Sequence, residues 1–475
     1  MFLNSICNFI IFLKYVDLLQ TKEYNLLHRK SKKEVFIMSN FIAQFVSKFL
    51  TSLISVAFVF QGMKSGTTGT EIKTPDDFTP VLRFIACSDI HLNGEEDQKN
   101  AKRFRELIAD MYAFSETQEY KNLDAIMVAG DFSGGGDKSQ YEMYNKIISE
   151  SVKESTQVLT VLGNHEFIDY RDVDATVGYE VYKKYINEDV DTDVVINGYH
   201  FIGVSYDDDG KSFTNKMVWL DKTIAAAVKE DPSKPVFVYN HPHPTLTVYG
   251  SVNWGDMSLR TVLSKYPQVV DFSGHSHYSP SDPRSVWQGE FTAIGCGSLS
   301  AFMGNLNYIE GDQDAPGESG GAWLVECDAN GNVRMKLYDV ANRMFFSNVE
   351  YYFTDLADAS KRTYNWHQQK SLDTKPEFPE NSAVTSSVSE NGEVIISFPE
   401  AKGYYEAENY KIKVTDSKNK TVFEKTVISE YVRATDDPVS VNLGNLSAGE
   451  YTVKVGSYSP YAKAGQELKN TIVVE

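Results

Sequence analysis

The sequence predicts a layered α/β fold followed by a small all-β sandwich domain. Between residues 81 and 289, short apolar segments alternate with longer amphipathic ones, which is the pattern of strands connected by helices. After residue 383, apolar and polar residues alternate with the two-residue period of β-strands. Because the chain has 475 residues, which is too many for one ordinary core, we expect at least two folded domains.

The strands expected in the first domain are short apolar runs at residues 82–87, 125–129, 158–162, 200–204, 236–239 and 269–273. Amphipathic helices are expected at residues 98–111, 139–154, 215–229 and 259–266. After residue 289 the pattern changes to hairpins, with strands at 323–327 and 333–338 on either side of the turn DANGN. This change predicts a second sheet that closes a catalytic domain of residues 81–353.

A connecting helix is expected at residues 355–370, and a linker at 371–382, where two prolines interrupt the pattern. The strands expected beyond it are residues 393–397, 410–415, 421–428, 439–441, 450–455 and 471–474. Residues 354–382 are therefore assigned to a helix and linker. Residues 383–475 are similar in size and strand rhythm to a fibronectin type III module.

The N-terminal region has the features of a targeting segment. Residues 49–60 (FLTSLISVAFVF) form an apolar run of signal-peptide length, preceded by Lys48. We expect residues 38–80 to be a signal peptide or membrane anchor plus a linker, and the protein to be exported, either extracellular or attached to the cell surface. Met38 is the expected start and residues 1–37 an over-extended reading frame; alternatively, residues 2–13 are the export signal.

The net charge argues against nucleic-acid binding as the function of this chain. The formal net charge is −19, whereas proteins that bind nucleic acid generally carry basic patches that neutralise phosphates. A phosphate group bound by this chain would need local positive charge, for which bound metal cations are the obvious source.

Polar motifs follow the predicted strands, at the carboxyl edge where α/β sheets bind ligands. They are Asp-Ile-His (89–91), Gly-Asp (130–131), Gly-Asn-His-Glu (163–166), Asn-His-Pro-His (240–243) and Gly-His-Ser-His (274–277). Carboxylates, amide oxygens and imidazoles are suitable ligands for Mn, Fe or Zn, and a carboxylate such as Asp131 can bridge two ions. The glycines of these motifs are expected to let the backbone turn sharply.

In the Asp-Ile-His motif, the side chains of Asp89 and His91 are expected to bind one ion together. Spacing from the strand end favours His241 over His243 as a ligand. His243 is expected to line the substrate cleft or to pack as a hydrogen-bonded surface histidine. The acidic residues 207–209 are expected to form a solvated loop.

These motifs, in this order, resemble those of the calcineurin-like metallophosphoesterases over roughly residues 82–338. The resemblance implies a four-layer α/β/β/α sandwich with two divalent or trivalent metal ions (Mn, Fe or Zn). It implies a metal-bound hydroxide as nucleophile and a contact of His165 with the phosphate or the leaving oxygen. The implied ligands of metal 1 are Asp89, His91, Asp131 and His277, and those of metal 2 are Asp131, Asn164, His241 and His275.

Departures from the family pattern argue against two branches of the family and leave a phosphomonoester or a phosphodiester as the substrate. The phosphate-clamping arginines of protein phosphatases are absent, and Gly134 stands where purple acid phosphatases have a tyrosine ligand. Residues 163–167 (GNHEF) are similar to a motif of secreted nucleotidases, so a nucleotide substrate is one alternative.

A second alternative is a cell-surface binding protein with an inactive phosphoesterase scaffold, whose C-terminal domain contacts a cell surface or wall polymer. No predicted ligand lies beyond His277, so a chain ending near Phe353 is expected to keep most of its activity.

Overall fold

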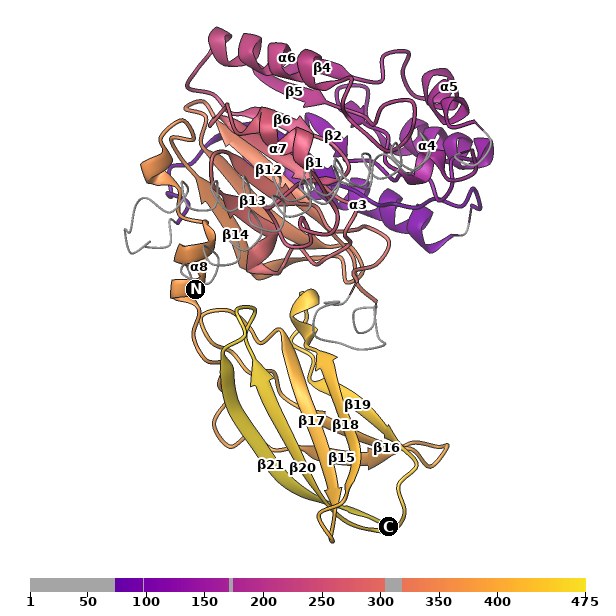
Figure 1. Ribbon diagram of the computed structural model, residues 1–475, viewed down its shortest axis with the longest axis vertical. Coiled ribbons are helices and arrows are strands. Elements are labelled where there is room, and N and C mark those ends of the chain that lie inside the picture. Colours follow the sequence, from indigo (N-terminus) through magenta and orange to yellow (C-terminus); the bar gives the residue numbers. More distant parts are fainter. Residues whose placement is uncertain (1–72, 97, 171–173, 304–317) are drawn as a thin grey trace, which may run out of the picture. The chain divides into compact units, whose positions relative to one another are not determined.

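The computed structural model describes residues 73–96, 98–170, 174–303 and 318–475 (Figure 1). The predicted signal segment, the alternative export signal and the expected start at Met38 lie outside these residues. Within the described residues, no helix combines the length and apolar character needed to cross a membrane.

One six-stranded sheet has the order β14-β13-β12-β1-β2-β3. Its parallel half consists of β1 (Pro80–Cys87), β2 (Ala125–Val128) and β3 (Gln157–Thr160). The antiparallel half is β12 (Gly321–Asp328), β13 (Val333–Asp339) and β14 (Met344–Phe353). The hairpin predicted around the DANGN turn is confirmed as β12 and β13.

The second six-stranded sheet has the order β10-β11-β9-β6-β5-β4. Parallel strands form its centre: β5 (Tyr199–Gly203), β6 (Val236–Tyr239), β9 (Val269–Ser273) and β11 (Thr292–Gly295). Antiparallel strands β4 (Thr192–Ile196) and β10 (Val286–Gln288) form its edges. The edge strands were not predicted, because the sequence of β4, TDVVI, does not alternate apolar with polar residues and β10 has only three residues.

The two sheets pack face to face, and helices cover their outer faces (Figure 1). Phe84 of β1 contacts Phe201, Phe237 and Phe272 of the other sheet, with ring centroids 5.0–5.9 Å apart. The helices are α3 (Lys99–Thr117), α4 (Lys138–Ser151), α5 (Thr176–Tyr185), α6 (Met217–Glu230) and α7 (Met257–Leu263). The four-layer α/β/β/α architecture is confirmed.

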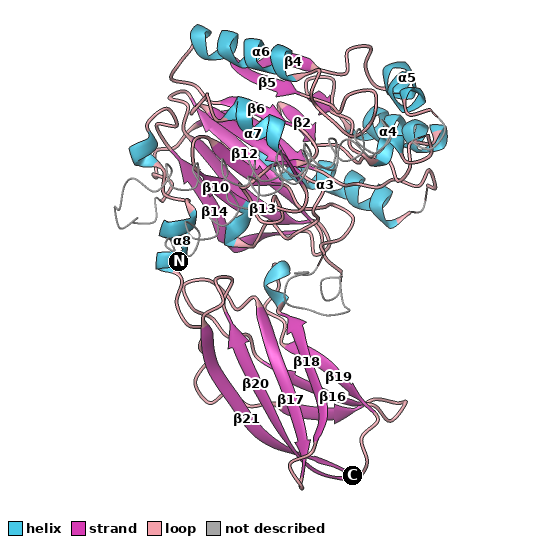
Figure 2. Cartoon of the chain, viewed as in Figure 1, coloured by secondary structure: helices cyan, strands magenta, loops and turns pink. Residues whose placement is uncertain are grey.

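The C-terminal strands form a second sandwich, coloured as strands in Figure 2. One sheet has the order β15-β16-β19 and the other β18-β17-β20-β21. Their bounds are β15 (Thr385–Val388), β16 (Val394–Phe398), β17 (Asn409–Asp416), β18 (Thr421–Ile428), β19 (Val439–Gly444), β20 (Gly449–Tyr458) and β21 (Ala464–Val474). The predicted small all-β domain is thus confirmed, with its own apolar core.

A tyrosine at the start of β20 supports the predicted likeness to fibronectin type III modules. The Tyr451 hydroxyl donates a hydrogen bond to the Ser447 carbonyl, 2.8 Å away. A tyrosine that bonds back to the backbone a few residues upstream is a recurring feature of immunoglobulin-like sandwiches. Assignment to the fibronectin type III type stays a prediction.

The segment between the two sandwiches is more ordered than a linker. In place of one helix over 355–370, the structure has a short 3-10 turn, η4 (Ala359–Lys361), and then α8 (Trp366–Leu372). Within the predicted linker, Phe378 packs into the core of the C-terminal domain, and Asp373 accepts a hydrogen bond from Ser459. This segment is therefore part of the packed structure.

Candidate metal centre

The seven predicted metal ligands all lie in loops that follow parallel strands. Asp89 and His91 follow β1, Asp131 follows β2, and Asn164 follows β3. In the second sheet, His241 follows β6, while His275 and His277 follow β9. Since the strands within each sheet run parallel, the topology brings these residues to one edge of the sandwich.

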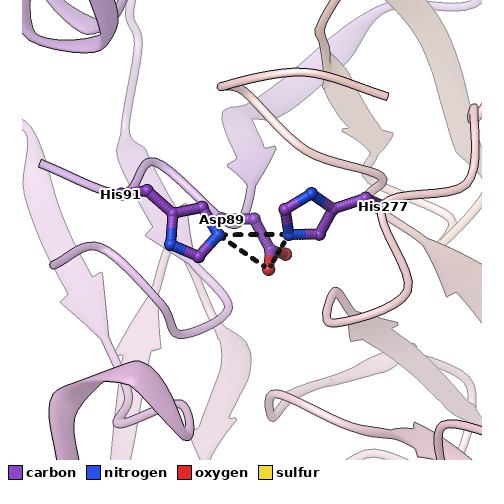
Figure 3. Close-up of side chains that lie close together, drawn as sticks. All are labelled: Asp89, His91 and His277. Carbon is purple, nitrogen blue, oxygen red and sulfur yellow. Dashed lines mark hydrogen bonds and ion pairs between the residues drawn. The ribbon is translucent and has the colours of Figure 1, made fainter. Parts of the chain in front are cut away.

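The side chains gather into two main groups. Asp89, His91 and His277 form the first ligand group (Figure 3). The His277 Nε2 atom lies 2.9 Å from Asp89 Oδ1 and 3.1 Å from His91 Nε2.

The second ligand group is Asp131, His241 and His275, and Asn164 lies beside it. His241 Nε2 lies 3.0 Å from Asp131 Oδ2 and 3.1 Å from both His275 Nδ1 and Asn164 Oδ1. Asp131 also forms a third group with His91 and His165, which places it between the two main groups.

The spacing of these atoms fits metal coordination. Ligand atoms about 2.1 Å from one ion in octahedral geometry lie about 3 Å from one another. Facing imidazole nitrogens at 3.1 Å, as in His91 and His277, can share at most one proton. A cation shared by the lone pairs accounts for both the spacing and the orientation.

The charge of the site also fits bound cations. Asp89, Asp131 and Glu166 are all at most 1% exposed. Among the described residues, no lysine or arginine forms an ion pair with these three carboxylates. Burial opposes ionisation of Asp131, yet the neighbouring His241 lowers the pKa of this carboxyl below its ordinary value. The buried negative charge therefore has only imidazoles to balance it, or metal ions when they are bound.

Five of the seven predicted ligands adopt left-handed backbone conformations. Their φ values are 55° for Asp89, 52° for His91, 50° for Asp131, 69° for His275 and 56° for His277. Such strain costs on the order of 1–3 kcal/mol per residue and tends to occur at functional sites. Asp89 and His91 therefore converge through left-handed turns after β1 ends.

Two of the motif glycines are needed for close approach of neighbouring groups. A Cβ at Gly163 would lie 2.1 Å from Asp131 Oδ1, and one at Gly274 would lie 1.9 Å from Ser88 Oγ and 2.2 Å from Asp89 Oδ2. Of the three glycines predicted to provide a sharp turn, only Gly130 has a positive φ, of 83°. At Gly163 and Gly274, the lack of space for a side chain explains the glycine better than the backbone conformation does.

We expect Gly274→Ala to destabilise the protein by about 1–3 kcal/mol, because the new methyl group must displace Ser88 or Asp89. Displacement of Asp89 should also weaken metal binding. Gly295→Ala is the matched control, since a Cβ there would meet no atom closer than 3.5 Å. Chemical unfolding and metal titration of both variants test this prediction, and equal behaviour of the two would contradict it.

Glu166 is a positioning residue to which the sequence analysis assigned no role. Its carboxylate accepts hydrogen bonds from the backbone N–H groups of Asp131, Gly163 and Ser133, at 3.1, 2.6 and 2.9 Å, and from the Ser133 hydroxyl at 2.9 Å. These bonds join the loops after β2 and β3. The acidic residue at the end of the Gly-Asn-His-Glu motif was the available signal.

His165 is oriented toward the ligands without being inside either main group. Its Nδ1 atom lies 2.9 Å from the Gly134 carbonyl, so Nδ1–H can donate there. Its Nε2 atom lies 3.9 Å from Asp131 Oδ2, and the side chain is 32% exposed. Because Nδ1 faces the Gly134 carbonyl, Nε2 is the ring nitrogen available to a substrate held at the centre.

His243 lies behind the ligands. It is 1% exposed, and its two ring nitrogens lie 2.8 Å from the hydroxyls of Ser273 and Ser276. Burial lowers the pKa of this imidazole to about 3, so the ring is neutral. The expected hydrogen bonds are present, but the expected surface position is wrong, because the ring is buried. This geometry favours a positioning role for the loop that carries His275 and His277, and substrate contact by His243 stays a prediction.

Two further segments differ from expectation. Asp207, expected in a solvated loop, is 3% exposed and accepts hydrogen bonds from the Ser212 hydroxyl and the Asn215 N–H. Trp254, to which no role was assigned, places its ring 5.1 Å from the ring of His275. No sequence signal marks this tryptophan, because its loop lacks regular periodicity.

Comparison with known proteins shows which family the segment around this centre resembles. Residues 82–279 match the family model of the calcineurin-like phosphoesterases. This segment is therefore similar to the calcineurin-like phosphoesterases, and it contains all seven predicted ligands. No curated protein sequence matches the chain.

Three solved structures show only distant likeness. A purple acid phosphatase, PPD1, from yellow lupin (Lupinus luteus) seeds is 13% identical over 58% of this chain and 55% of that one, with a TM-score of 0.44. The FN1–FN3 domains of chicken CNTN1 are 12% identical over 33% and 48%, with a TM-score of 0.17. Dimeric latent PorU from Porphyromonas gingivalis is 13% identical over 30% and 12%, with a TM-score of 0.16. The match thus spans about half or less of the length of each of these structures.

Proposed function

We propose that this chain is an exported phosphoesterase that uses two metal ions to hydrolyse phosphate monoesters or diesters. The observation that carries the proposal is the pair of ligand groups with Asp131 between them. Asp89, His91 and His277 would hold one ion. Asn164, His241 and His275 would hold the other, and Asp131 would contact both.

Each group of residues has a distinct task in this proposal. Bound metal ions would supply Lewis acidity and an activated water at neutral pH. Glu166 holds the loops after β2 and β3 in register, while His243 and its two serines hold the loop after β9. His165 would donate a proton to the leaving oxygen or bind the phosphoryl group through Nε2.

The intact ligand set supports catalysis over the alternative of an inactive scaffold with a binding function. All seven positions carry side chains that can bind metal, and these side chains converge. A scaffold that had lost its activity would be under no constraint to keep five strained backbone positions at this site.

The test combines metal analysis with a substrate panel. Protein purified without chelators should contain close to two ions per chain. After loading with Mn, Fe or Zn, it should hydrolyse at least one class among phosphomonoesters, phosphodiesters and nucleotides. Preference for nucleotides would support the nucleotidase alternative, and metal-loaded protein inactive on every class would contradict the proposal.

Export and cell-surface attachment form a separate part of the proposal, supported by the apolar run at residues 49–60. Fractionation of the native cells, with N-terminal sequencing of the mature protein, tests it. Protein found only in the cytoplasm with an intact N-terminus would contradict export. Contact of the C-terminal domain with a wall polymer also stays a proposal and is tested by co-sedimentation of the full chain with isolated cell walls.

A further inference from the structure

A buried cluster of charged side chains joins the phosphoesterase domain to the C-terminal sandwich. Arg284 donates through Nε and Nη2 to the two oxygens of Asp282, at 2.8 and 2.5 Å, and through Nη2 to Glu408. Arg284, Asp282 and Glu408 are 8%, 0% and 2% exposed. Glu408 directly precedes β17, so the C-terminal domain supplies one carboxylate of the cluster. Removing one partner from such a cluster leaves an uncompensated buried charge.

The arginine of this cluster also holds an aromatic pair beside the metal centre. Its guanidinium lies 3.9 Å from the centroid of the Tyr249 ring, and its carbonyl accepts a hydrogen bond from the Tyr249 N–H at 2.9 Å. Tyr249 stacks on Tyr278, with centroids 4.4 Å apart and planes at 23°. Tyr278 directly follows the predicted ligand His277. Two contacts, from Arg284 to Tyr249 and from Tyr249 to Tyr278, therefore connect the cluster with the loop that carries His277.

The same loop contacts a second ligand further along. Gly250 follows Tyr249, and its carbonyl accepts a hydrogen bond from the Trp254 N–H at 2.9 Å. The Trp254 ring meets His275 edge-on, at 5.1 Å and 85°. The segment of residues 245–256 thus contacts His275 through Trp254, and it contacts Tyr278, the neighbour of His277 in the sequence, through Tyr249. It is held at Tyr249 by the arginine cluster.

We propose that Glu408 of the C-terminal domain is a positioning residue for the metal centre, acting through Arg284 and Tyr249 on the loop that carries His275 and His277. The C-terminal sandwich then contributes, through Glu408, to the geometry of the metal centre. This inference rests on the proposed metal centre and departs from the expectation that a chain ending near Phe353 keeps most of its activity. Residues that act on a site through a chain of packed side chains typically change its affinity by about 2–30-fold.

The first experiment compares Glu408→Ala with Val453→Ala in the full chain. Val453 is fully buried in the core of the C-terminal sandwich and contacts none of the cluster residues named here, so its truncation controls for lost domain stability. We expect Glu408→Ala to weaken binding of Mn or Zn by about 2–30-fold. Val453→Ala should leave metal affinity unchanged at a comparable loss of thermal stability. Equal metal affinities of Glu408→Ala and the unmodified chain would overturn the proposal.

The second readout does not depend on metal. In the metal-free protein, hydrogen exchange of residues 245–256 and 274–279 should become faster in Glu408→Ala and not in Val453→Ala. If the unmodified chain bound no metal, the proposed function would fail while this readout would still test the link. Should Glu408→Ala not fold, Glu408→Gln keeps the shape and should show a smaller change in the same direction. Unchanged exchange in Glu408→Gln would then overturn the proposal.

A double-mutant cycle tests the route. If Glu408 acts through Tyr249, the loss of metal affinity in Glu408→Ala combined with Tyr249→Ala should equal the larger single loss. Additive losses would overturn this route. Tyr249→Phe is the matched control, because it keeps the ring that stacks on Tyr278, and its metal affinity should be unchanged.

Discussion

Replacement of Asp131 by alanine is expected to remove both metal ions and to lower hydrolysis by at least about 10³-fold, since bound metal supplies several kcal/mol of transition-state stabilisation. The physical reason is that Asp131 lies between the two ligand groups. Its Oδ2 atom is 3.0 Å from His241 Nε2, and its Oδ1 atom accepts the His165 N–H at 2.8 Å. The same substitution therefore also frees the loop after β3.

Metal analysis and steady-state kinetics of three variants check this expectation. Asp131→Asn keeps an acceptor for the His165 N–H but loses the charge, and should retain more metal than Asp131→Ala. Asp169→Ala removes an exposed carboxylate near the same loop and should keep full metal content and activity. Retention of two ions by Asp131→Ala would disprove the bridging role.

Replacement of His165 by alanine is expected to keep both metal ions and to slow the hydrolysis of esters with poor leaving groups by about 10²–10⁴-fold. Alkyl diesters need a proton on the departing oxygen, whereas p-nitrophenolate leaves readily as an anion. The loss should therefore be much smaller for p-nitrophenyl esters. Since Nδ1 is committed to the Gly134 carbonyl, Nε2 is the nitrogen available to the substrate.

Measuring both substrates on one variant separates the roles that His165 can have. Equal losses would show that it binds the phosphoryl group instead of donating a proton. Loss of metal from the variant would show that His165 is itself a ligand. This outcome is tested because His165 lies in one group with His91 and Asp131. His200→Ala is the control. His200 lies in β5 and pairs with Asp193 of the edge strand β4, so its replacement should change neither the metal content nor the rate of hydrolysis.

Local patterns were enough to predict much of the α/β core. Strands β6 and β9 begin and end at the residues expected from their apolar runs, and the DANGN turn correctly marked the hairpin of β12 and β13. Local sequence patterns did not predict the elements whose bounds depend on contacts with distant residues. The edge strand β4 shows no clean alternation, and the segment expected as one helix over 355–370 is divided because Tyr364 packs against Tyr351 and Phe353 of β14.

The sequence by itself determined which residue types meet at the site, because ordered polar motifs after parallel strands must share one edge of the sheets. Only the tertiary structure decided how they meet. Left-handed turns at Asp89 and His91, the close approach at Gly274, and the burial of His243 between two serines all depend on contacts between distant segments. Local sequence constrains short-range geometry, whereas the link from Glu408 through Arg284 to Tyr249 spans more than 100 residues and two domains. Such a link exists only once both domains have folded and packed together.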